Sequence, residues 1–165
     1  MKNILFTVLL VVFTFTSNAS EKGDRANINQ VIDQYIMTED AGDMKKQAKL
    51  MSKDRVWVGF GGRMTNQAMN MKIQLEQYKQ AKLFMPDVEW FSDARDRLIK
   101  FYGKGNVAIA SFYWYRTFVL PANAPLEKAK FYKQPSPAVV TIVLERDGKK
   151  WKMIHTHSSP MAPQN

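Results

Sequence analysis

Regular alternation of apolar and polar positions marks the last third of the chain. Residues 139–145 and 151–159 are two runs rich in β-branched and aromatic side chains, and the turn sequence Asp147-Gly148 lies between them. Two such runs joined by an Asp-Gly turn predict a β-hairpin. Residues two apart on a strand point to one face, so one face of the second arm is expected to carry Trp151, Met153, His155 and His157.

The first half of the chain has helical spacing instead. Apolar side chains recur every three or four residues over 28–39, and a capping box of Asn27 and Gln30 precedes them, which predicts a first helix. A short second helix with a lysine-rich outer face is expected over 44–51. Residues 66–84 contain no glycine or proline, and they predict the third and longest helix.

The remaining apolar runs predict strands. The first strand covers 54–60 and carries Arg55 and Trp57 on one face, and a Gly-Gly turn with a short return strand follows it. Further strands are expected over 88–91, 97–102 and 107–120, with a turn flanked by Asp93 and Asp96 between the first two.

The predicted strand over 107–120 is apolar on both faces. One face carries Val107, Ile109, Ser111, Tyr113, Tyr115, Thr117 and Val119, and the other carries Ala108, Ala110, Phe112, Trp114, Arg116, Phe118 and Leu120. An antiparallel sheet with one solvated side normally alternates apolar and polar residues. We therefore expect helices over one face and a second copy of the chain over the other, which makes a homodimer.

The segment 121–137 that follows this strand contains four prolines. Two interpretations stay open for it. It is either a lid over a site or a long connector that includes an edge strand over 129–133.

The chain begins with the layout of a secretory signal peptide. Lys2 supplies a basic start, an apolar run extends from Ile4 to Phe15, and small residues surround Ala19, after which cleavage is expected. The apolar run is about a dozen residues long, against roughly 20 for a membrane span, so no permanent membrane anchor is predicted. The expected location is periplasmic or secreted. The boundaries are then 1–19 for the signal peptide, 20–26 for a flexible N-terminus, 27–160 for the domain and 161–165 for a flexible tail.

Composition narrows the functional classes further. A chain of 165 residues that is 45% hydrophobic is the size of one domain with a real core. The absence of cysteine excludes disulfides and thiol catalysis. The formal net charge of +9 favours encounters with anionic molecules, although a solvated lysine surface is the favoured explanation of it. Export and the lack of a basic-aromatic repeat argue against a nucleic-acid partner.

The two histidines of the chain are the first candidates for chemistry. His155 and His157 are spaced to converge on a metal, but no cysteine or further histidine supplies the third protein ligand of a catalytic zinc site. We predict no metal, and we interpret the histidines as structural or as one pocket-lining group that titrates near neutral pH. Glu39 and Asp40 fall in a helix junction and are assigned to capping or solvation. No phosphate loop or dinucleotide fingerprint occurs, and no cofactor is predicted.

The closing residues carry a family resemblance. A strand, the turn Arg146-Asp147-Gly148, then Trp151 and an ending of the form H-x-H-S resemble the SnoaL-like branch of the nuclear transport factor two superfamily, and the resemblance extends over 27–160. It implies an α+β fold in which a cone-shaped, curved antiparallel (mixed) sheet wraps around three N-terminal helices. It also implies a pocket, without naming a substrate.

The resemblance does not carry over a catalytic group. A mechanism similar to that of ketosteroid isomerase needs an aspartate near the end of the strand that begins at Asp54, where this chain has Gly59. The kinase association domain of the same superfamily has an arginine after the second histidine, where this chain has Ser158. Catalysis is therefore not required by anything in the sequence.

The leading functional hypothesis is a domain that holds a small apolar or anionic ligand in a cone lined by some of Tyr35, Trp57, Tyr113, Tyr115 and Arg116. One alternative is a small hydrolase, isomerase or dehydratase that uses His155 or His157 as a base, with a tyrosine as oxyanion donor. Another is a dimeric protein-interaction module. A cavity with an inward histidine favours the enzyme, a cavity without one favours the binder, and a filled cone favours the interaction module.

Overall fold

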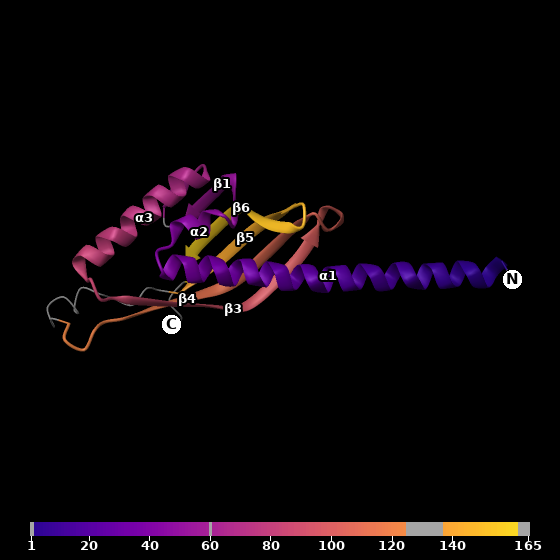
Figure 1. Cartoon of the computed structure of the whole chain (residues 1–165), viewed down its shortest axis with the longest axis horizontal. Helices are drawn as coiled ribbons and strands as arrows, with labels where there is room; N and C mark the ends of the chain where they lie inside the picture. Colours follow the sequence, from indigo (N-terminus) through magenta and orange to yellow (C-terminus); the bar gives the residue numbers. More distant parts are fainter. Residues whose placement is uncertain (1, 60, 125–136, 162–165) are drawn as a thin grey trace.

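Three helices cover one face of a curved sheet. The computed structural model describes residues 2–59, 61–124 and 137–161, with side chains from residue 21 onward. The helices are α1 (Lys2–Asp40), α2 (Met44–Ala48) and α3 (Gln67–Phe84), and α1 lies along the sheet while its first half extends beyond it (Figure 1). In the described part of the chain, no helix combines the length and the hydrophobicity that a membrane span requires.

Among the described residues, the sheet has six strands in the order β2-β1-β6-β5-β4-β3. Neighbouring strands are antiparallel except for β1 and β6, which run parallel. The predicted hairpin is present as β5 and β6, and the predicted α+β fold is confirmed. The strands are β1 (Met51–Gly59), β2 (Gly62–Met64), β3 (Glu89–Tyr102), β4 (Val107–Val119), β5 (Ala138–Asp147) and β6 (Lys150–Pro160).

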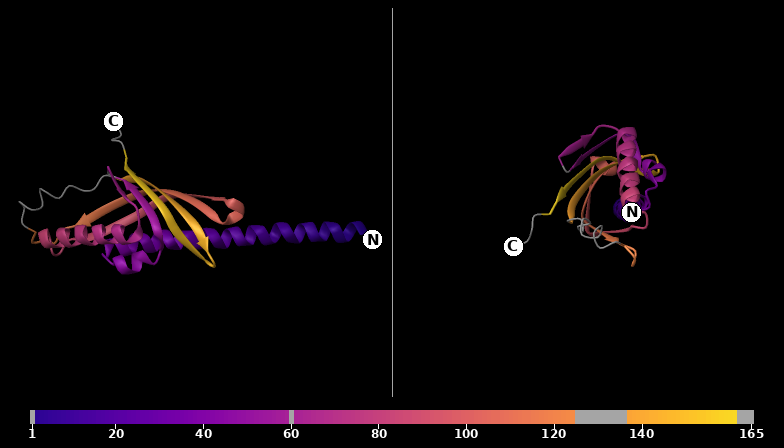
Figure 2. Two further views of the ribbon diagram at one scale, coloured as in Figure 1. Left: turned by 90° about the horizontal axis from the view of Figure 1, so that it is seen from above. Right: turned by 90° about the vertical axis from the view of Figure 1, so that its left-hand side faces the viewer.

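The core lies between α1 and the concave face of the sheet. Ile28 and Ile32 on α1 are fully buried against Phe112, Ile142 and other inward residues of the central strands. The sheet curves around this helix, as the end-on view in Figure 2 shows. Burying an apolar helical stripe in this way supplies most of the stability that an isolated helix lacks.

α1 begins earlier than its apolar spacing predicts. Residues 21–26, expected to be flexible, are helical, and Asp24 is 9% exposed. Its carboxylate accepts hydrogen bonds from Trp151 Nε1 at 3.2 Å and from Arg146. The sequence prediction failed here because Asp24 is held by the β5–β6 hairpin, more than 100 positions away, and not by an apolar pattern of its own.

A glycine lets α3 pack against the junction of α1 and α2. Gly42 has a φ of +68°, and a Cβ at this position would lie 2.4 Å from the ring of Tyr78. The ring of Tyr78 therefore occupies the space that any side chain at 42 needs. This contact fixes α3 against the junction of α1 and α2.

β3 is one strand and not the two that were predicted. Its pairing with β4 shifts register between Arg95 and Leu98, and Asp96 has a φ of 52°. An extra residue in one strand of an antiparallel pair is a β-bulge, which bends the strand without ending it. The expected turn between Asp93 and Asp96 is this bulge.

β6 also carries a bulge, and this bulge decides where the histidines point. Leu144 pairs with Met153 while Val143 pairs with His155, so Ile154 is the extra residue. Trp151 and Met153 are buried on the concave side before it, and Thr156 and Ser158 are buried on that side after it. The prediction that His155 and His157 share a face with Trp151 and Met153 is therefore wrong.

No helix of the described residues covers the outer face of the sheet. This face carries several exposed apolar side chains, including Phe91, Leu98, Tyr113 and Val119, of which Leu98 is 57% exposed. The prediction that helices cover only one face of β4 is confirmed. The expected edge strand over 129–133 and most of the proline-rich segment lie outside the described residues, as does most of the expected flexible tail.

Candidate functional site

A cavity of about 490 Å³ lies between the concave face of the sheet and the helices α1 and α3. Small-molecule sites typically have volumes of roughly 300–1,000 Å³ and mostly apolar walls with a few polar groups. The apolar walls here include Trp57, Met64, Trp90, Trp114, Ala138 and Val140, and the polar groups include Tyr35, Glu39, Gln74, Arg116, Thr156 and Ser158.

Two other depressions lie beside the β5–β6 hairpin. They measure about 540 and 650 Å³, and lysines and other polar side chains make up most of their lining. They lack the paired aromatic walls of the first cavity, which is therefore the better candidate for a small-molecule site.

Aromatic rings line the cavity. The guanidinium carbon of Arg116 lies 4.4 Å from the ring centre of Trp90 and 5.9 Å from that of Trp114, and Tyr35 meets Trp114 edge to face with 6.2 Å between ring centres. The indole N–H of Trp114 is buried and has no hydrogen-bond partner among the described residues. Stacking of this kind holds the rings in fixed positions.

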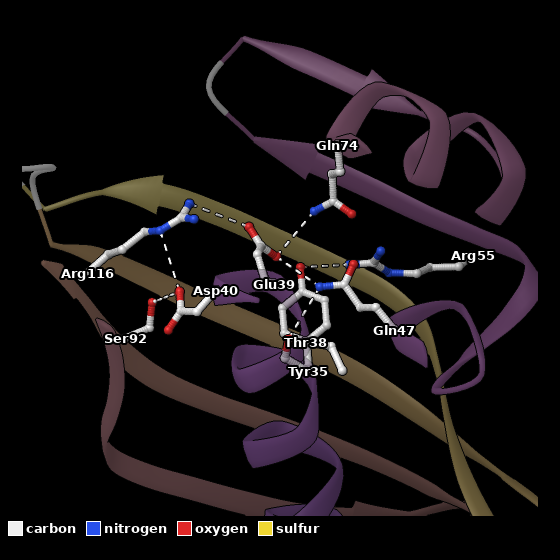
Figure 3. A network of polar contacts seen from close by, with 9 residues as sticks. All are labelled: Tyr35, Thr38, Glu39, Asp40, Gln47, Arg55, Gln74, Ser92 and Arg116. Atoms are coloured by element: carbon white, nitrogen blue, oxygen red, sulfur yellow. Dashed lines mark hydrogen bonds and ion pairs between the residues drawn. The ribbon is translucent and has the colours of Figure 1, made fainter. Parts of the chain in front are cut away.

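Glu39 is the acidic centre of the site, and its oxygens are already engaged. One oxygen accepts hydrogen bonds from Gln47 Nε2 at 3.1 Å and from Gln74 Nε2 at 3.2 Å, and the other lies 3.7 Å from Arg116 (Figure 3). Asp40 lies 3.7 Å from Arg116 as well, and it accepts from Ser92. Capping or solvation was expected for Glu39 and Asp40, but both carboxylates offset the charge of Arg116.

Arg55 lies beneath the cavity and is fully buried. It donates to Thr156 Oγ1 at 2.9 Å, to Asn70 Oδ1 at 3.1 Å and to the Tyr35 hydroxyl at 3.5 Å. Burial, reinforced by the negative charge of Glu39, raises the pKa of Tyr35 to about 12. Tyr35 therefore remains a neutral phenol that donates a hydrogen bond and does not act as a base near neutral pH.

The model of the SnoaL-like domain family matches residues 28–163. The chain belongs to this family. The resemblance inferred from the closing hairpin is thus confirmed. No curated protein matches the sequence.

Solved structures share the fold of this SnoaL-like domain at low sequence identity. It is similar to an NTF2-like protein with a cystatin-like fold from Novosphingobium aromaticivorans, with a TM-score of 0.72, 14% identity and coverage of 91% of this chain and 90% of that one. An NTF2-like superfamily protein from Salmonella enterica serovar Typhimurium gives a TM-score of 0.65 at 19% identity, covering 91% and 96%. A protein from Catenulispora acidiphila in complex with S-DNPA gives a TM-score of 0.68 at 13% identity, covering 84% and 94%.

Three of the five residues assigned to the pocket from sequence line the cavity of the SnoaL-like domain: Tyr35, Trp57 and Arg116. Tyr113 and Tyr115 lie on the outer face of β4, where Tyr113 is 36% exposed and Arg95 stacks over Tyr115 at 4.7 Å. Strand parity separates the two groups, because Trp114 and Arg116 point inward while the tyrosines alternate with them.

Glu39, Gln74 and Thr156 were missed. Glu39 follows Tyr35 by four residues on a helix, so the two share a face, and this spacing is the signal that could have placed Glu39 in the site. No comparable signal exists for Thr156, because the bulge in β6 determines its orientation.

The histidines do not line the cavity. His155 is partly buried on the outer face, where burial, together with the charges of His157 and Arg55, lowers its pKa. Within the described residues, no three histidine, aspartate or glutamate side chains are grouped to hold a metal ion. The geometry of β6 therefore gives the alternative that uses a pocket histidine as a base no inward histidine in this cavity.

Gly59 occupies the position at which a mechanism similar to that of ketosteroid isomerase needs a catalytic aspartate. It lies at the end of β1 and lines the cavity. A Cβ there would lie 2.7 Å from the carbonyl oxygen of Ser158 and 2.9 Å from the ring of Trp57. This cavity therefore has no room for a side chain at position 59.

Proposed function

We propose that this SnoaL-like domain binds a small, largely apolar ligand in the cavity between the sheet and α3. The observation that carries the proposal is the space of about 490 Å³ walled by Trp57, Trp90 and Trp114. Indole rings offer a large apolar area in a rigid arrangement, which suits flat ring systems. The Catenulispora acidiphila relative, which is in complex with S-DNPA, supports a ligand-binding role for this fold.

Binding, and not catalysis, is the function that the polar groups of the cavity support. The carboxylate of Glu39 already accepts from two amides and faces Arg116, so it is not poised to remove a proton. The raised pKa of Tyr35 keeps its hydroxyl protonated. Both histidines lie on the opposite face of the sheet.

A matched pair of variants on β5 tests the proposal. Ala138 lines the cavity, whereas its neighbour Val139 points to the other face. Native mass spectrometry of protein purified from its own source is expected to show a bound small molecule in the wild type and in Val139→Phe, and to show its loss in Ala138→Phe, where the ring fills the cavity. Equal retention by both variants, or no small molecule bound to the wild type, would refute the proposed function.

We also propose that the chain is exported and that it forms a homodimer through the outer face of the sheet. The N-terminal basic and apolar pattern supports export, and the exposed Phe91, Leu98 and Val119 support the dimer, since each is more than half exposed. The intact mass of the protein isolated from its host is expected to correspond to a chain that begins at Ser20. Sedimentation is expected to give a dimer at micromolar concentration, and a monomer would contradict the interface.

A further inference from the structure

Arg55 fixes the direction of a hydroxyl group in the cavity wall. A guanidinium group has only N–H donors and cannot accept a hydrogen bond. Since Arg55 donates to Thr156 Oγ1 at 2.9 Å, the hydrogen of the Thr156 hydroxyl has to point elsewhere. Thr156 donates to no other group in the described part of the chain, and it lines the cavity. Its free hydrogen is thus available as a donor to a ligand.

Ser158 adds a second hydroxyl to the same wall. It lies two residues after Thr156 on β6 and faces the same side. It is 3% exposed, and its Oγ has no hydrogen-bond partner among residues 2–59, 61–124 and 137–161. Unpaired buried hydroxyl groups are costly, so a partner supplied by a ligand explains why such a residue is present in an otherwise apolar wall.

The wall opposite β6 offers a hydrogen-bond acceptor to a ligand, where β6 offers donors. The carboxylate of Glu39 can only accept, so the amide of Gln74 has to direct Nε2 toward it, which fixes the orientation of that amide. Gln74 Oε1 is left buried without a hydrogen-bond partner in the described structure. Donors therefore lie along β6, and an acceptor lies on α3.

The two arginines of the site differ in how far carboxylates offset their charge. Arg116 has Glu39 and Asp40 within ion-pair distance, but Arg55 makes no ion pair with any described carboxylate. Its partners are hydroxyl, amide and thioether groups. The field behind Thr156 is thus positive, and it favours an oxygen that carries negative charge or a strong dipole.

We propose that the ligand places a hydrogen-bond acceptor oxygen, from a carboxylate or a carbonyl group, against the hydroxyls of Thr156 and Ser158, with its apolar rings against the tryptophans. Arg55 is a positioning residue in this arrangement, because it orients Thr156 and does not line the cavity itself. This inference rests on the proposed ligand-binding function and adds the chemical class of the ligand's buried end.

Four probes that share one ring system separate the possibilities. The probes are 2-naphthoate, 2-acetylnaphthalene, naphthalene and 2-naphthylmethylammonium, and their affinities for the full chain are measured by isothermal titration calorimetry. At least one oxygen probe is expected to bind about tenfold more tightly than naphthalene, since a satisfied buried donor is worth about that factor. The ammonium probe is expected to bind more weakly than naphthalene. A preference for naphthoate over the ketone assigns the acceptor to a carboxylate, and the reverse assigns it to a carbonyl.

Serine variants on β6 provide the matched control. Ser158→Ala is expected to remove most of the advantage of the oxygen probe while the affinity for naphthalene stays unchanged, and Ser159→Ala, on the other face, is expected to change neither. Thr156→Val is expected to lose the same advantage and Thr156→Ser to restore it. A purely structural role for these residues would shift all four probes together.

The two proposals fail in different ways. If naphthalene binds as tightly as both oxygen probes, or if the ammonium probe binds most tightly, the acceptor proposal is refuted while the apolar cavity remains a binding site. If none of the four probes binds, both proposals are refuted.

Discussion

Substitution of Asp24 gives the sharpest test of how α1 is held to the sheet. Its carboxylate accepts from Arg146 at 2.5 Å and from Trp151 Nε1 at 3.2 Å, and its side chain is 12% exposed. Asp24→Ala leaves a partly buried guanidinium and a buried indole N–H without these acceptors. Arg146 keeps its stacking contact with Trp151, whose ring centre lies 4.6 Å from its guanidinium carbon.

The expected loss follows from these contacts. A hydrogen bond to a charged group contributes about 1.5–3 kcal/mol, and Arg146 keeps the carbonyl oxygen of Gly105 as an acceptor at 3.2 Å, so the loss is expected at the lower end for two such bonds. We therefore expect Asp24→Ala to lower the free energy of unfolding by about 3 kcal/mol. For a domain of this size, a change of that magnitude lowers Tm by roughly 6–12 °C.

Urea unfolding followed by tryptophan fluorescence measures this loss, because Trp151 is 3% exposed in the folded state. Glu21→Ala is the control, since Glu21 pairs with Arg25 where both side chains are about half exposed, and such pairs contribute about 0–1 kcal/mol. A loss for Asp24→Ala no greater than that for Glu21→Ala would show that residues 21–26 do not pack on the hairpin.

Three further predictions concern single positions. Gly59→Ala is expected to cost about 1–3 kcal/mol of stability and to weaken ligand binding, because its Cβ would overpack the cavity. Urea unfolding and ligand titration check this. Gly62→Ala is the comparison, since the nearest atom to its Cβ would be 3.6 Å away. Gly42→Ala is expected to cost at least about 1 kcal/mol through its positive φ and the ring of Tyr78, and no change in the urea midpoint would contradict the packing of α3. His155 has a pKa lowered below its usual 6.5, so the unfolded chain takes up a proton first as the pH falls; stability is therefore expected to decrease from about pH 6.5 downward, with a smaller decrease in His155→Gln.

Much of the fold follows from local patterns, and the exceptions have identifiable causes. The helical spacing over 28–39 and the Asp-Gly turn gave α1 and the β5–β6 hairpin, because both signals act within a few residues. The bulges at Asp96 and Ile154 left no comparable signal. Each depends on how a strand fits its neighbours, and the one at Ile154 reverses the faces of all later residues on β6.

Trp57, Tyr35 and Arg116 were named from sequence for their aromatic area, hydroxyl group and positive charge, and the structure places all three in the cavity wall. A ligand-binding role for them stays a prediction. The role of Glu39 depends on amides from α2 and α3, which no local pattern connects to it. Buried polar networks of this kind arise from tertiary structure. The aromatic residues of the cavity can therefore be predicted from sequence, but its hydrogen bonds cannot.

The position of β6 has a consequence for how the sheet forms. This strand follows the other five described strands along the chain, yet it lies between β1 and β5 and joins the two halves of the sheet. Without β6, the hairpin of β1 and β2 and the meander of β3, β4 and β5 have no strand pairing with each other and meet only through the helices. Formation of the complete sheet therefore depends on the residues of β6.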